Sequence, residues 1–112
     1  DRLASDLNQQ PLGFVAFWKA TDRWFCADDQ TKQMFMEKLR SVMDEARAKG
    51  VQTFGNFDCS WSCEWRYFTF WLCPNIELLE ETMRKLTEIG DINLFNVQHH
   101  YVGRRTAEEF VQ

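Results

Sequence analysis

Two adjacent histidines, His99 and His100, are the residues of this chain best suited to move a proton. The pKa of histidine is ordinarily about 6.5, so burial or a neighbouring carboxylate readily moves it near neutral pH. The pair lies in a strand-like segment, where neighbouring side chains point to opposite faces of a sheet. One of them is therefore a candidate catalytic group facing a cavity, and a metal site made by the pair is disfavoured. A hydrogen-bonded structural histidine is the alternative.

Four cysteines form a second group with possible chemistry. Cys59 and Cys63 have the C-x3-C spacing of half a zinc site, but Cys26 and Cys73 do not supply a second such pair. A chain of this size can bury an apolar core without disulfides, and small secreted scaffolds are richer in cysteine. We predict four free thiols and no bound metal. A reactive thiolate next to a base is the alternative.

The segment 57–73, FDCSWSCEWRYFTFWLC, has aromatic residues at almost every other position. The whole chain has ten Phe, five Trp and two Tyr, more than a core of this size usually needs. A mainly apolar pocket with a few polar groups is the common form of a small-molecule site. The predicted ligand-binding residues are Trp18, Lys19, Asn56, Trp65, Tyr67 and Trp71. Core filling would explain the same rings.

Composition argues against several kinds of partner and cofactor. A net charge of −4 disfavours nucleic acid, because phosphate binding needs a basic patch. No apolar run approaches the roughly 20 residues of a bilayer span, and the first residues lack the features of a signal peptide. We therefore expect no membrane partner and, by default, a cytoplasmic location. No glycine-rich loop for a nucleotide is present, and only the two histidines could suggest haem, so no cofactor is predicted.

Two segments have the apolar spacing of helices that pack on a core. The first is expected to begin at the carboxylates of residues 28–29 and to end near Gly50, which suits a left-handed cap. The second is expected to begin at Asn75 and to end near Gly90. The apolar stripes are Phe35, Leu39, Val42, Met43 and Ala46 in the first, and Leu79, Met83, Leu86 and Ile89 in the second.

Four segments, 13–19, 51–58, 64–72 and 95–102, have the character of strands. Both alternating sets of side chains in 64–72 are rich in rings, so we expect this strand to be covered on both faces. One set should pack on the helices, and the other should line a cavity or touch a second subunit. The first set is Phe68, Phe70 and Leu72, and the second is Trp65, Tyr67 and Trp71.

The order strand, helix, strand, strand, helix, strand predicts a ferredoxin-like α+β fold. In this βαββαβ arrangement a four-stranded antiparallel sheet carries both helices on one face. We predict one domain over residues 1–112, with a core at about 11–103 and terminal extensions at 1–10 and 104–112. Two helices cover only one face of such a sheet, so the other face needs a partner.

Element order, chain length and the doubly apolar strands GFVAFWK and WRYFTFWL resemble the dimeric α+β barrel proteins over residues 11–103. In that superfamily two ferredoxin-like subunits place their bare sheet faces together, which implies a homodimer here. Its members include cofactor-independent monooxygenases, muconolactone-type isomerases and haem-handling enzymes. No signature of one member family is present, and a fold does not by itself select a function.

The function expected from these features is binding of a flat apolar or aromatic small molecule in an aromatic-lined cavity. One alternative is a cofactor-independent monooxygenase or isomerase, in which His99 or His100 transfers the proton and Tyr67 or Asn56 stabilises oxyanion charge. Another is a dimerisation or interaction module without a ligand. The volume and lining of the cavity distinguish these alternatives.

Overall fold

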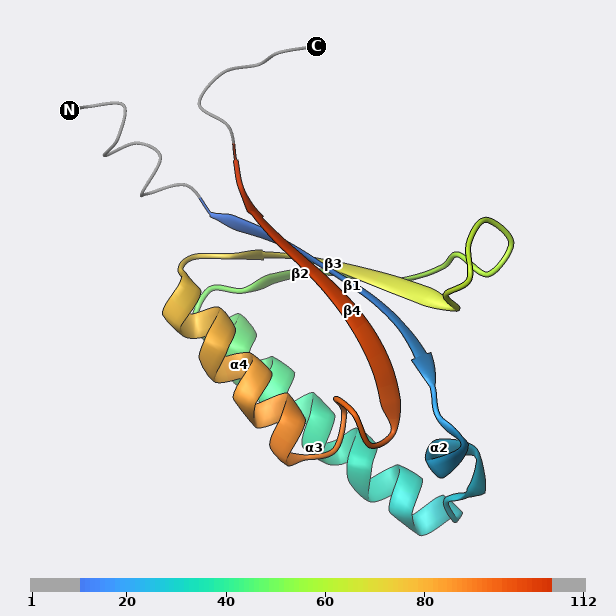
Figure 1. Ribbon diagram of the computed structural model, residues 1–112. Helices are drawn as coiled ribbons and strands as arrows, with labels where there is room; N and C mark the ends of the chain where they lie inside the picture. The colour runs from blue at the N-terminus through green and yellow to red at the C-terminus, as the bar shows by residue number, and fades with distance from the viewer. Residues whose placement is uncertain (1–10, 106–112) are drawn as a thin grey trace, which may run out of the picture.

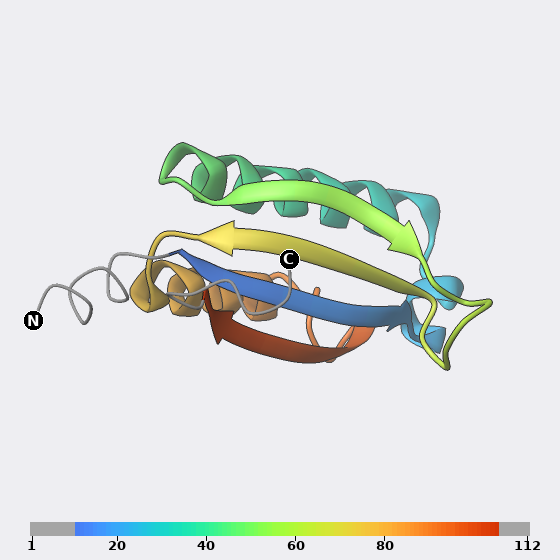
Figure 2. The same ribbon diagram turned by 90° about the horizontal axis from the view of Figure 1, so that it is seen from above.

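The computed structural model describes residues 11–105 and contains one sheet with a single layer of helices (Figure 1). The strands are β1 (Leu12–Ala20), β2 (Gln52–Asp58), β3 (Tyr67–Cys73) and β4 (Asn96–Arg104). They pair in the order β2-β3-β1-β4, and every pair is antiparallel. The long helices α3 (Asp29–Ala48) and α4 (Ile76–Glu88) lie side by side on one face of this sheet (Figure 2). The predicted ferredoxin-like α+β fold is thus confirmed.

The long helices begin and end at the residues that the sequence indicated. Asp28 Oδ1 and Asn75 Oδ1 each accept a hydrogen bond from the backbone N–H three residues further on, at 2.7 and 2.8 Å. Gly50 follows α3 with a φ of 115°, a conformation that glycine adopts without strain. The short helix α2 (Asp22–Cys26) was not predicted. Within residues 11–105 no helix is long and apolar enough to cross a membrane.

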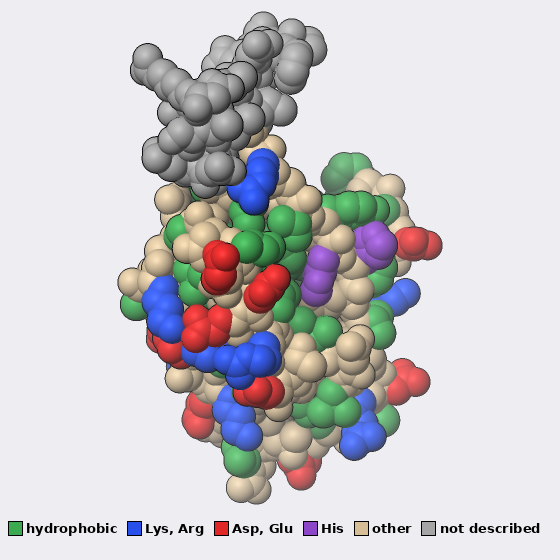
Figure 3. Space-filling model, turned by 60° about the vertical axis from the view of Figure 1, so that its left-hand side comes forward, with side chains coloured by type: hydrophobic (Ala, Val, Ile, Leu, Met, Phe, Trp, Pro, Cys, Tyr) green, Lys and Arg blue, Asp and Glu red, His purple; other side chains and the backbone are tan. Residues whose placement is uncertain are grey.

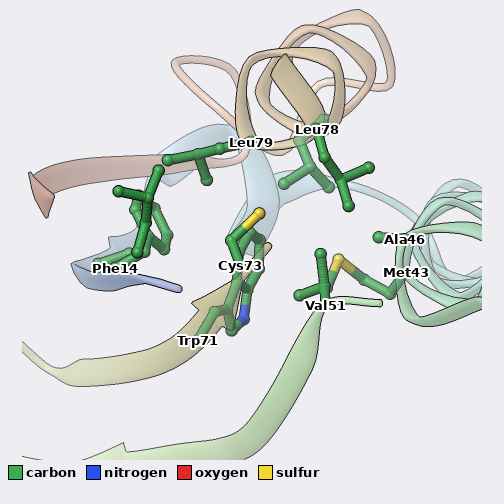
Figure 4. Packing of buried hydrophobic residues seen from close by; sticks show 11 residues of the cluster. Phe14, Met43, Ala46, Val51, Trp71, Cys73, Leu78 and Leu79 are labelled. Atoms are coloured by element: carbon green, nitrogen blue, oxygen red, sulfur yellow. The ribbon is translucent and has the colours of Figure 1, made fainter. Parts of the chain in front are cut away.

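The core lies between the sheet and the two long helices (Figure 4). Phe14 of β1 and Trp71 of β3 are cross-strand partners, and their ring centroids are 4.8 Å apart. Both rings are almost fully buried. The core also contains Leu12, Ala16, Met43, Ala46, Val51, Cys73, Leu78, Leu79 and Leu86. Burial of this apolar surface is the main stabilising contribution to the fold.

Charged side chains on the outer surfaces of α3 and α4 link the two helices (Figure 3). Lys85 Nζ lies 2.8 Å from Glu45 Oε1 and 3.3 Å from Glu81 Oε1. Lys49 Nζ lies 3.2 Å from a carboxylate oxygen of each of the same two residues. Such solvent-exposed pairs contribute at most about 1 kcal/mol each. They align the helices more than they stabilise the domain.

The predicted assignment of the two faces of β3 is wrong. Trp71 belongs to the helix side, whereas Phe68 and Phe70 lie on the free face. The Phe68 ring lies 5.1 Å from that of Phe57, and the Phe70 ring 5.6 Å from that of Phe54. Because both alternating sets of this strand are aromatic, the pattern identified a strand without indicating which set faces the helices.

The face of the sheet opposite the helices is rich in apolar side chains that no described element covers (Figure 1). Phe54 and Phe57 of β2 are 50% and 46% exposed, and Tyr101 of β4 is 59% exposed. Large apolar side chains concentrated on one open face are typical of an interaction surface. We call this surface, together with Val15, Phe17, Phe68, Phe70, Leu72 and Val97, the free face.

Replacing Phe14 by Ala should lower the free energy of unfolding by about 3–5 kcal/mol, because it empties a fully buried aromatic site. The control Met34→Ala removes a half-exposed side chain of α3, away from the core and from the free face, and should cost less than about 1.5 kcal/mol. Urea denaturation of all proteins at one concentration measures both values. Equal losses would contradict the position of the core.

Candidate functional site

A cavity of about 1110 Å³ opens between the sheet and α3, on the helix side and not on the free face. Its floor is the centre of the sheet, where Ala16 of β1 faces Thr69 of β3. Gly55 of β2 lies next to them in a β-bulge with a φ of 83°, and an added Cβ there would meet no atom within 4 Å. Thr69 Oγ1 donates to the Gly55 carbonyl oxygen at 3.0 Å. Small side chains at the floor thus leave space beneath α3.

Two aromatic pairs flank this floor along β1 and β3. Phe14 and Trp71 lie at one end, and Trp18 and Tyr67 lie at the other, with the latter ring centroids 4.6 Å apart. Phe14 and Trp18 are four residues apart on an extended strand, a separation of about 13 Å. Trp18 Nε1 donates to Asn56 Oδ1 at 3.1 Å, which fixes the orientation of the indole. The result is a slot with ring walls and a small-residue floor.

Helix α3 supplies the roof of the cavity. Four of its six lining residues, Met36, Arg40, Met43 and Arg47, are spaced by four, three and four positions, so they share one face of the helix. The charged groups at the cavity are mostly cationic: Arg40, Arg47 and Arg66, against one carboxylate, Asp91. Lys19 also lines the cavity, but its ammonium lies over the Trp65 ring outside it. The cavity therefore combines apolar walls with a cationic lining.

Asp91 is held by side-chain amides of β4. Its Oδ1 accepts from Asn96 Nδ2 at 3.0 Å, and its Oδ2 accepts from Gln98 Nε2 at 3.1 Å. Burial raises the pKa of the Asp91 carboxyl, and these two hydrogen bonds partly oppose that shift. Since Gln98 donates to Asp91, its Oε1 is the acceptor for His100 Nε2, 2.6 Å away. His100 Nε2 therefore carries the hydrogen when the ring is neutral.

The two predicted catalytic histidines face opposite sides of the sheet, and neither is among the residues that line the cavity. His99 lies on the free face, with ring centroids 4.8 Å from Tyr101 and 6.3 Å from Trp65. His100 lies on the helix side, with its ring 5.1 Å from Phe14. Both side chains reach the surface (Figure 3). The cavity thus offers no imidazole nitrogen for proton transfer or for a haem iron.

Five of the six predicted ligand-binding residues come together at the cavity: Trp18, Lys19, Asn56, Tyr67 and Trp71. The sixth, Trp65, lies outside it, in the loop before β3, where Lys19 Nζ is 5.4 Å from its ring centroid. Sequence reasoning missed the contribution of α3. The recurrence of Met and Arg at helical spacing would have indicated it.

The loop between β2 and β3 brings two cysteines together without forming part of the cavity. Cys59 is buried and Cys63 is exposed, and their Sγ atoms are 3.5 Å apart. All four cysteines are free thiols in the structure. Among residues 11–105 no three His, Cys, Asp or Glu side chains are placed to hold a metal ion. The reduced state of these thiols in solution stays a prediction.

Comparison with solved structures identifies the class of fold. Two mutant chlorite dismutases from Candidatus Nitrospira defluvii, an Arg-to-Glu mutant and a Trp-to-Phe mutant in complex with cyanide, superpose with TM-scores of 0.71 and 0.70. The alignments cover 97% and 99% of this chain but 46% of each of those chains, at 8% identity. The chain thus shares the ferredoxin-like fold of those proteins, and it spans about half of their length.

Sequence comparison then gives the family. The profile of a family of unknown function, DUF6616, matches residues 12–110, so the chain belongs to that family. Comparison with curated proteins gives no match. At 8% identity the likeness to chlorite dismutase shows the fold alone.

The environment of His100 predicts a dependence of stability on pH. Burial, with the neighbouring His99 as a smaller cause, lowers the pKa of His100 from 6.5. The unfolded chain gains a proton below about pH 6.5, but the folded chain gains it only at lower pH. The free energy of unfolding should therefore fall as the pH falls through 6.5 towards the folded pKa.

An NMR titration of the His100 ring should give a midpoint below 6.5. Gln at this position could still donate to Gln98 Oε1, so His100→Gln should flatten this part of the stability profile. A midpoint above 6.5 would contradict the buried position of the ring.

Proposed function

We propose that this protein binds a flat apolar or aromatic small molecule in the cavity between the sheet and α3. The observation that supports this function is the slot itself, whose small-residue floor lies between two aromatic pairs. The rings of Trp18, Tyr67 and Trp71 would contact the ligand, and Asn56 would hold Trp18 in place. Each stacked or edge contact contributes about 0.5–1.5 kcal/mol beyond burial.

Two observations favour binding over the alternatives. An enzyme that uses a cavity histidine needs a ring nitrogen within hydrogen-bond reach of the ligand, and the lining residues include neither His99 nor His100. An interaction module without a ligand needs no internal space, whereas this domain has about 1110 Å³ next to its core. A concave, mainly apolar pocket with a few polar groups is the common form of a small-molecule site.

We also infer that two copies associate through the free face. Exposure of Phe54, Phe57 and Tyr101 on one open sheet is costly in water, and a second free face is an apolar partner of matching shape. The resemblance to the dimeric α+β barrel class supports the same surface. In this arrangement the ligand cavity and the subunit interface lie on opposite faces of one sheet.

The neutral probe N-phenyl-1-naphthylamine should become fluorescent on binding to the cavity. Tyr67→Ala removes one ring wall, so the dissociation constant of the probe should rise about five- to tenfold. Tyr101→Ala is the matched control, because it removes a tyrosine from the free face and should leave the dissociation constant unchanged. Absence of any binding to the wild-type protein would rule out the proposed function.

Sedimentation at micromolar concentration should show a dimer for the wild-type protein. Phe57→Glu places a charge in the proposed interface and should give monomers, because an unpaired buried charge is strongly unfavourable. Met34→Glu is the control, since Met34 is 49% exposed on α3 and lies away from the free face. A monomeric wild-type protein, or equal effects of both substitutions, would contradict this interface.

A further inference from the structure

The lining of the cavity differs in charge from the rest of the chain. The chain has 13 Lys and Arg against 17 Asp and Glu, for a net charge of −4. The cavity lining instead has three arginines, Arg40, Arg47 and Arg66, against one carboxylate, because the ammonium of a fourth basic residue, Lys19, lies over Trp65 outside the cavity. An acidic protein thus concentrates positive charge where a ligand would enter, and such a concentration attracts anions.

The single acidic residue does not balance this charge. Both oxygens of Asp91 already accept hydrogen bonds, from Asn96 and from Gln98. Burial raises the pKa of Asp91. Among residues 11–105 Asp91 forms no ion pair with a lining cation. Its contacts are those of a structural tie between β4 and the preceding loop.

One of the three lining arginines, Arg40, lacks a carboxylate partner within the described chain. Arg47 pairs with Asp44 at 3.1 Å, and Arg66 pairs with Asp58 at 3.3 Å. Arg40 forms no ion pair among residues 11–105.

The ion pairs on the outer surface of the helices provide a comparison for Arg40. There Lys49 and Lys85 each contact two carboxylates, although other exposed cations, such as Lys38 of α3, form no ion pair among residues 11–105. Arg40, by comparison, lies on the face of α3 that roofs the cavity and has no such partner within residues 11–105.

We propose that the ligand is an anion: a flat apolar or aromatic body that ends in a carboxylate or a similar group. This inference rests on the proposed function. The body lies between the aromatic pairs, and the anionic group is bound by Arg40 within the positive field of Arg47 and Arg66. A guanidinium can bind a carboxylate through two parallel hydrogen bonds, and such charge-assisted bonds are stronger than neutral ones.

Two fluorescent probes with the same aromatic body test the proposal. 1-Anilinonaphthalene-8-sulfonate is an anion, and N-phenyl-1-naphthylamine lacks the sulfonate. We expect the anionic probe to bind at least about fivefold more tightly, the effect of one charge-assisted contact. Its affinity should fall as salt is added, because added ions screen exposed charges. Tyr67→Ala should weaken both probes, which assigns them to the cavity and not to the free face.

Substitutions on α3 isolate the role of one guanidinium. Arg40→Gln should raise the dissociation constant of the anionic probe about fivefold or more and leave that of the neutral probe unchanged. Arg40→Lys should keep most of the preference, because it keeps the charge. Lys38→Gln is the matched control: it removes one positive charge from an exposed, non-lining position of the same helix and should change neither probe.

The outcomes separate this inference from the proposed function. If neither probe binds, both are overturned. If both probes bind with equal affinity, or the neutral one binds more tightly, the cavity is a binding site but its ligand is not selected by negative charge. If Arg40→Gln and Lys38→Gln weaken the anionic probe equally, the contact with Arg40 is overturned.

Discussion

The register between β1 and β3 is the constraint on which the rest of the structure depends. It places Ala16 opposite Thr69 and puts an aromatic pair on either side of them, Phe14 with Trp71 and Trp18 with Tyr67. A shift of one residue in either strand would send its side chains to the other face of the sheet. The core, the cavity and the free face would then all be lost together. One pairing between two central strands thus determines three features of the molecule.

The fold could be predicted from the sequence because its signals are local. Capping residues such as Asp28 and Asn75, and glycines such as Gly50, mark the ends of helices whatever the tertiary context. The faces of β3 could not be predicted in this way. Alternation carries information about orientation only when one set is polar, and in this strand Phe68 and Phe70 alternate with Tyr67 and with Trp71.

The sequence predicted most of the sheet residues of the site but not the cavity that brings them together. Trp18 and Tyr67 were predicted as aromatic walls of a pocket and Asn56 as one of its polar groups, and the three do meet at one cavity. The cavity itself depends on Ala16 and Thr69, which are far apart in the sequence. No local pattern shows that small residues will lie side by side in a sheet. The space beneath α3 is therefore a tertiary feature, which the sequence alone did not place.

The aromatic excess of this chain has two separate explanations, and the type of ring distinguishes them. Four of the seven aromatic residues that line the cavity are Trp or Tyr, which have a polar group, as Trp18 shows by donating to Asn56. The free face is instead largely Phe, at positions 17, 54, 57, 68 and 70. Phenylalanine offers apolar area without a hydrogen-bonding group, which suits a surface that meets another apolar surface. A polar ligand group can be bound only where the rings and their neighbours supply donors. The division of ring types between the two faces therefore agrees with a ligand on the helix side and a second subunit on the other.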